Sequence, residues 1–248
     1  MHDGYLPYVL IGLTFVLAGV IKGVTGMGLP TVAIGLLGLI MAPAEAAALL
    51  VIPSVVTNVW QFVAGPNRVQ TAKRIWTMLI AIFIATWLST GLIAGGGMSN
   101  ATLGLGIALV VYALVGLAKV QLTVSRPMER WLAPVIGAAT GVVTGATGVF
   151  VIPAVPYLQA LGLNKDDLVQ TLGLSFTVST IALAAGLATH DAFHITAVGE
   201  SAVCTAPALI GMMAGQWVRA RVNPTTFRLL FFIGLLILGA NLILRSVL

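Results

Sequence analysis

Charge is what this sequence most lacks. Only 8% of its 248 residues are Asp, Glu, Lys or Arg, whereas 59% are hydrophobic. A soluble domain carries about 25% charged residues, so this chain could not cover a water-facing surface. The composition therefore predicts an all-α integral membrane protein surrounded by the lipid bilayer.

Residues that perform catalysis or bind metals are also scarce, with three His and one Cys in the whole chain. Cys204 has no cysteine partner and no evident His base. His190, Asp191 and His194 share a short loop, but no third His or Cys is near them in sequence. The sequence therefore argues against an intramembrane enzyme, and we expect no catalytic residue, no cofactor and no metal.

The twelve Lys and Arg residues are better explained by membrane topology than by nucleic-acid binding, which we exclude as a function. Most of them fall in three groups: Arg68, Lys73 and Arg74; Lys119, Arg126 and Arg130; Arg219, Arg221 and Arg228. Basic loops stay in the cytoplasm, so loops 66–74 and 119–131 are expected there, in a multi-pass protein of the cytoplasmic (inner) membrane. The N-terminus would lie outside, with the apolar run from Tyr5 retained as the first membrane helix because no basic region or cleavage site precedes it.

Glycine, in contrast, is abundant, and one glycine-containing segment occurs twice. The stretch Gly19–Pro30 recurs as Gly141–Pro153. The matched residues are Gly19 and Gly141, Gly23 and Gly145, Thr25 and Thr147, and Gly26 and Gly148. Hydrophobic segments interrupted by Gly and Pro at corresponding places in two halves point to the binding site of a transporter.

The duplication predicts two membrane repeats, residues 1–120 and 132–248, joined by a basic cytoplasmic loop at 121–131. We expect about 8–10 hydrophobic helical segments, and a full span needs about 20 residues. Segments 27–41, 132–146 and 149–162 are shorter than that, so they are interpreted as half-helices or arms of a broken or re-entrant helix in each half. Because the second repeat would start on the cytoplasmic side, the two repeats would have inverted topology.

The paired Gly-x-x-x-Gly-x-x-Gly…Pro segments, the length and the basic central loop resemble the TauE/SafE family, the sulfite exporter-like permeases. The resemblance covers essentially the whole chain. The sequence departs from the glycine-richer family pattern at Met27, Phe150 and Val151. The resemblance implies secondary transport of a small sulfur-containing anion, sulfite or an organosulfonate, usually out of the cell.

Candidate substrate-binding residues lie in and near the glycine segments. Lys22 is the one basic residue deep within an apolar segment, where an ionisable group suggests a functional site. We expect Lys22 to supply charge, the backbones of Gly26 and Gly148 to supply amide donors, and two broken helices to meet at the membrane midplane. Side chains that could orient the anion are Thr25, Thr147, Asn58 and Ser175.

Each of these residues also has a structural interpretation. Lys22 could extend to the membrane interface, and the two threonines could bond backbone carbonyls at the glycine kinks. Asn58 belongs to a polar stripe with Ser54, Thr57 and Gln61, which could bond neighbouring helices instead of a substrate.

The sequence favours an alternating-access carrier with a site between the repeats. An anion channel or a non-transporting membrane subunit is the alternative, and an intramembrane enzyme is the least favoured. The particular anion, the coupling ion and the oligomeric state stay open, a homodimer included.

Overall fold

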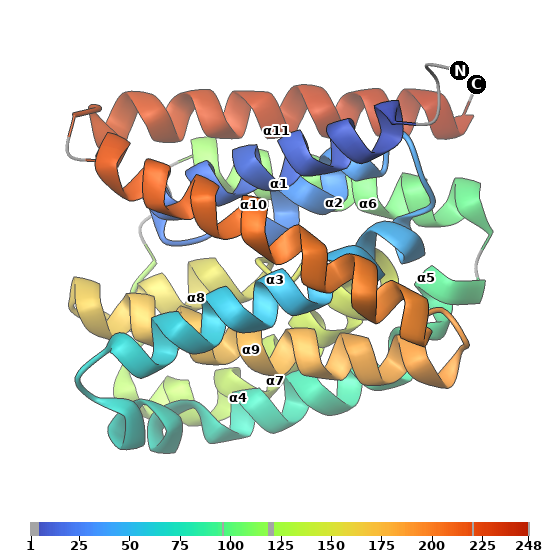
Figure 1. Ribbon diagram of the computed structural model, residues 1–248. Helices are drawn as coiled ribbons and strands as arrows, with labels where there is room; N and C mark the ends of the chain where they lie inside the picture. Colours follow the sequence, from blue (N-terminus) through green and yellow to red (C-terminus); the bar gives the residue numbers. More distant parts are fainter. Residues whose placement is uncertain (1–4, 96, 119–121, 220, 248) are drawn as a thin grey trace.

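The computed structural model describes residues 5–95, 97–118, 122–219 and 221–247. In these residues all the regular structure is helical (Figure 1). The helices are α1 (Leu6–Thr25), α2 (Leu29–Leu37), α3 (Pro43–Ala64), α4 (Arg68–Ser89), α5 (Gly91–Gly95), α6 (Met98–Leu117), α7 (Arg126–Thr147), α8 (Ala154–Ala160), α9 (Lys165–Thr189), α10 (Ile195–Arg219) and α11 (Pro224–Val247). The predicted all-α fold is confirmed.

Seven stretches of the described chain are long and apolar enough to cross a membrane. They are α1, α3, α4 together with α5, α6, α9, α10 and α11. Large apolar side chains such as Leu13, Leu88 and Val203 are exposed on these helices. Exposed apolar surface of this extent fits lipid as the surrounding medium, so the chain is an integral membrane protein.

Helix α7 differs from the sequence prediction. It is 22 residues long and begins at Arg126, so residues 126–131 are helical and segment 132–146 is not a half-helix. Pro127 occupies the first helical turn, where a missing N–H costs nothing. The charged residues of this first turn lie outside the apolar run, so the sequence did not predict the turn as part of the helix. Glu129 is nevertheless buried, and its carboxylate accepts two hydrogen bonds from Arg74. The short helices are α2, with 9 residues, and α8, with 7.

The contacts between helices follow the same pattern from whichever half of the chain they are traced. Counting α4 and α5 as one segment, α1, α2, α3, α4 and α6 correspond in order to α7, α8, α9, α10 and α11. The first helix of each half packs on the fourth helix of the other: α1 on α10, and α7 on α4. Helix α3 packs on both α9 and α10, α9 packs on both α3 and α4, and α6 packs on α11. The two halves are therefore interlocked.

Glycines allow close approach at the two crossings between a first and a fourth helix. A Cβ at Gly19 or Gly23 would collide with backbone atoms of α10, at the carbonyls of Ala208 and Met212. A Cβ at Gly141 would lie 2.8 Å from the carbonyl oxygen of Ile82 on α4. Small residues spaced four apart are the usual means of close helix packing in lipid. The matched Gly-x-x-x-Gly pairs of the sequence thus form two equivalent helix crossings.

Two turns that contain or adjoin basic residues lie at one end of the helix bundle: Arg68 begins α4 directly after the α3–α4 turn, and Arg221 lies in the α10–α11 turn. The α3–α4 turn and the α10–α11 turn both lie at the left in Figure 1. Asn67 in the first of these turns donates to Asp167 near the start of α9 at 2.8 Å. We call this the basic end. In Figure 1, α4 runs away from it and α10 runs toward it, so these corresponding helices point in opposite directions.

Candidate functional site

The two glycine breaks have the same local geometry. Gly26 ends α1 with φ 80°, and Gly148 ends α7 with φ 71°. Both are left-handed conformations that glycine adopts without steric cost. The N–H of Gly26 donates to the carbonyl of Lys22, and the N–H of Gly148 donates to that of Thr144, each at 2.7 Å. Neither amide is free to donate to a substrate in this structure, because both already close the end of their own helix.

Thr25 and Thr147 play matched local roles at these breaks. Each hydroxyl donates to the carbonyl four residues earlier, that of Ile21 at 2.8 Å and that of Val143 at 2.7 Å. Each oxygen also accepts from the N–H two residues later, that of Met27 at 3.2 Å and that of Val149 at 3.1 Å. These bonds support the structural interpretation, in which the threonines fasten the chain as it leaves the helix.

Replacing Thr147 with valine should lower stability and leave anion binding unchanged. The buried N–H of Val149 would lose its acceptor, which costs about 1–3 kcal/mol. Thermal unfolding and sulfite titration of the same sample measure the two effects, with Thr147→Ser as the control that keeps a hydroxyl. Weaker sulfite binding at unchanged stability would instead place Thr147 on the substrate path.

The two breaks do not meet, contrary to the sequence prediction of a shared site. Gly26 lies beside Gln61 near the end of α3, whereas Gly148 lies beside Ala47 near its start. Fourteen residues of α3 separate these contacts, or about 21 Å along the helix axis. Thr147 and Gly148 are therefore remote from Thr25 and Gly26. The reason is that α1 and α7 are both full-length helices, and each glycine break lies at the C-terminal end of its helix.

Lys22 and Asn58 are brought together as the centre of a polar site. The Lys22 side chain is 3% exposed, and its ammonium donates to the side-chain oxygen of Asn58, which is fully buried. The ion pair found in the described residues joins Arg74 and Glu129 and does not involve Lys22. A buried ammonium that is bonded to a neutral amide retains a strong preference for an anionic partner.

A cavity of about 470 Å³ reaches Lys22 from the basic end, and Asn58 is not among the residues that line it. Its lining includes Lys22, Thr57, Gln61, Asp166, Gln216 and Arg219. Gly26 lines the cavity too, and its carbonyl accepts a hydrogen bond from the Gln61 amide at 2.6 Å. Gly26, at the break that ends α1, thus forms part of the cavity wall, although its N–H is already bonded to the carbonyl of Lys22.

Four buried polar atoms near the pair make no hydrogen bond within the described parts of the chain. They are the Asn58 amide nitrogen and the hydroxyls of Ser54, Ser175 and Ser179. Ser54 and Asn58 share one face of α3, and Ser175 and Ser179 share one face of α9. These helices pack together where Gly173 meets the backbone of Asn58. Buried polar groups normally have partners, so these four atoms are unusual, although none of their residues lines the cavity.

Sequence reasoning missed several polar residues of this cavity, among them Gln61, Gln216 and Arg219. Gln61 was visible in the polar stripe of α3 but was not assigned to the site. Gln216 carried no signal, and Arg219 was taken only as a topology marker. Both lie on α10 and line the cavity because α10 packs against α1 and α3. Contacts between helices this far apart in the chain cannot be read from local spacing.

Comparison with known proteins identifies the family of this chain. The model of the sulfite exporter TauE/SafE family matches residues 11–242. The chain belongs to this family. No curated protein and no solved structure matches it. Membership of the TauE/SafE family agrees with a membrane transporter of the sulfur-anion exporter type and with a non-enzymatic role.

Proposed function

We propose that this TauE/SafE protein is a secondary transporter that binds a small sulfur-containing anion, sulfite or a sulfonate, at Lys22 and Asn58. The observation that carries the proposal is the buried Lys22 ammonium, whose hydrogen-bond partner is a neutral amide and which lines an open cavity. An oxyanion in this cavity would accept a hydrogen bond from the Lys22 ammonium, which Asn58 orients. Charge-assisted bonds of this kind are among the strongest in proteins.

The proposed mechanism is alternating access by two inverted repeats in the cytoplasmic membrane. The exchange symmetry of the packing and the opposite directions of α4 and α10 support inverted topology. By the positive-inside rule, the basic end would lie in the cytoplasm and the start of α1 outside. The cavity at Lys22 then opens inward, as a carrier that collects a cytoplasmic anion for export would require. Motion between the interlocked halves would expose Ser175 and Ser179 to the other side.

Transport of radiolabelled sulfite in proteoliposomes tests this function. A carrier should give saturable flux and counterflow, in which unlabelled sulfite on one side accelerates entry of label from the other. Flux without saturation or counterflow would indicate a channel instead. If sulfite, sulfate, taurine and methanesulfonate all fail to bind the purified protein, the sulfur-anion assignment is wrong.

A further inference from the structure

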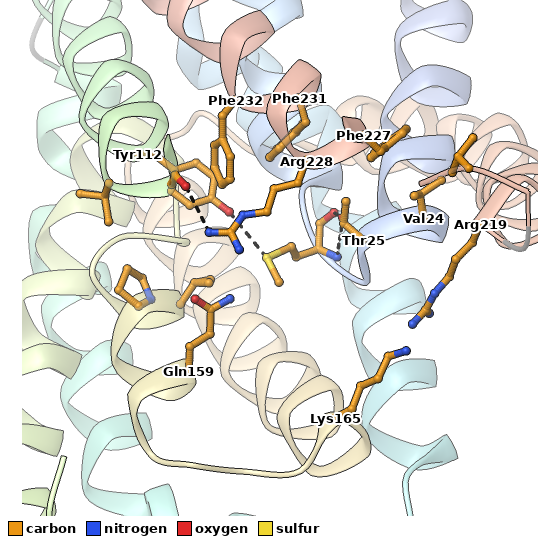
Figure 2. Close-up of a pocket in the computed structure, with 16 residues that line it drawn as sticks. Val24, Thr25, Tyr112, Gln159, Lys165, Arg219, Phe227, Arg228, Phe231 and Phe232 are labelled. Carbon is orange, nitrogen blue, oxygen red and sulfur yellow. Dashed lines mark hydrogen bonds between the residues drawn. The ribbon is translucent and has the colours of Figure 1, made fainter. Parts of the chain in front are cut away.

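The C-terminal turn of α1 stands between two cavities. Lys22 and Gly26 line the cavity already described, whereas Thr25 and Met27 line a second cavity of about 300 Å³. Arg219 lines both cavities, and Figure 2 shows Thr25 and Arg219 beside the second one. With a cavity on either side, packing alone holds this turn less firmly than it holds a helix end inside a filled core.

Two side chains of α3 reach across to this turn. Asn58 accepts a hydrogen bond from the Lys22 ammonium, and the Gln61 amide donates to the carbonyl of Gly26 at 2.6 Å. Asn58 and Gln61 are three residues apart on α3, and the two residues that they bond are four apart on α1, so the bonds join one face of each helix. The Gly26 N–H in turn donates to the Lys22 carbonyl at 2.7 Å. A shift of Gly26 would therefore move the Lys22 backbone with it.

Gln61 differs from a glutamine that only holds two segments together. Gln170 on α9 uses both ends of its amide: the nitrogen donates to the carbonyl of Phe62 at 2.8 Å, and the oxygen accepts from the N–H of Asn67 at 2.9 Å. Gln61 lines the cavity, and its buried amide oxygen has no hydrogen-bond partner in the parts of the chain that the structure describes. Unpaired buried acceptors are costly and uncommon, so this one favours a role at the site over a purely structural role.

The second repeat has no equivalent of the Gln61 contact. Aligning Gly65, after α3, with Gly186 of α9 matches Gln61 with Ala182, which has no side-chain donor. In the glycine segments, the position of the buried lysine is occupied by Thr144 in the second repeat. The glutamine bond and the buried cation therefore occur together, in the first repeat.

We infer that Gln61 is a positioning residue for the anion site. By fixing the C-terminal turn of α1 on α3, it holds the Lys22 ammonium at the cavity. The inference rests on the proposed function, because Lys22 is taken as the group that binds the anion. Since Gln61 acts through Lys22, its contribution to sulfite affinity should exist only while Lys22 is present. A purely structural glutamine would contribute equally with and without Lys22.

A double-mutant cycle tests this role, with calorimetric titration of sulfite into the full chain in phosphatidylcholine nanodiscs. Gln61→Met keeps the length of the side chain but removes the donor to Gly26, and it should weaken sulfite binding about threefold to tenfold, as expected for one lost hydrogen bond. In a Lys22→Gln background the same change should alter the affinity by less than about twofold, because residues that act through one another are not additive. Equal weakening in both backgrounds, or no weakening in either, would overturn the inference.

Gln170→Met is the matched control. It also removes a buried amide that bridges two segments, but Gln170 does not line the cavity. The control should lower the melting temperature and leave sulfite affinity unchanged. If Gln170→Met and Gln61→Met weaken sulfite equally, general loosening of the bundle is the cause, and the positioning role of Gln61 is refuted.

Hydrogen exchange followed by mass spectrometry gives a readout that needs no ligand. In Gln61→Met the amides of residues 22–26 should exchange about threefold faster or more, whereas Gln170→Met should leave them unchanged. If the wild type does not bind sulfite but this exchange responds, the sulfite function fails and the hold of Gln61 on α1 stands. If sulfite binding depends on Lys22 but the exchange does not depend on Gln61, the positioning role alone fails.

Discussion

Replacing Lys22 with glutamine should weaken sulfite binding about tenfold to a hundredfold and stop counterflow. The substitution removes the ammonium but leaves a side chain that can still donate to the Asn58 oxygen. A hydrogen bond to a charged group contributes about 1.5–3 kcal/mol, and each 1.4 kcal/mol changes a dissociation constant tenfold. Titration of the purified protein measures the affinity, and the proteoliposome assay measures the flux.

The same substitution should leave thermal stability unchanged or raise it. Lys22 is buried and is bonded to a neutral group, so no opposite charge compensates an ammonium at this position. Replacing buried charges with neutral groups of similar size is often neutral or stabilising. A lower melting temperature with normal sulfite affinity would show that Lys22 is structural and would refute the site.

Lys73→Gln is the control for this experiment. Lys73 is exposed on α4 and lines neither cavity, yet its loss changes the net charge by the same amount. Its affinity for sulfite should equal that of the wild type. Equal weakening in both variants would mean that the overall positive charge attracts the anion, with no specific contribution from Lys22.

Replacing Gly19 with valine should destabilise the protein by at least about 3 kcal/mol. The first added carbon would already collide with the carbonyl of Ala208 and lie 2.9 Å from the backbone nitrogen of Met212. Backbone atoms of a packed helix cannot move aside as a flexible side chain can, so α1 and α10 would have to separate. For a protein of this size we expect a fall in melting temperature of roughly 6–12 °C.

Gly12→Val provides the matched comparison on the same helix. A Cβ at Gly12 meets no atom within 4 Å, so the added side chain should fit and the melting temperature should stay within about 2 °C of the wild type. If both variants lose stability equally, the cause is the valine and not the helix crossing. Unchanged stability in Gly19→Val would refute the close approach of α1 and α10.

Part of the candidate site could be predicted because it depends on local sequence. Lys22 was selected by its depth in an apolar segment, and Asn58 by its place in a polar stripe. The structure joins these two by a hydrogen bond. Thr147 and Gly148 were selected because they match Thr25 and Gly26 in the other repeat. Matched residues occupy equivalent places in their own repeats, and these places need not be adjacent in space. The α1 and α7 breaks accordingly lie near opposite ends of α3.

The sequence by itself determined the membrane environment, the helical fold and the duplication. The chain has too few charged residues to cover a water-facing surface. In lipid the backbone must form its hydrogen bonds within the protein, which favours helices. The glycine segment occurs twice in the sequence. Only the tertiary structure decided that the glycine breaks lie apart and that Arg219 of α10 lines two cavities beside α1. The physical reason is that helix pairing between halves depends on residues almost 200 positions apart, as at Gly19 and Ala208. No local pattern encodes such contacts.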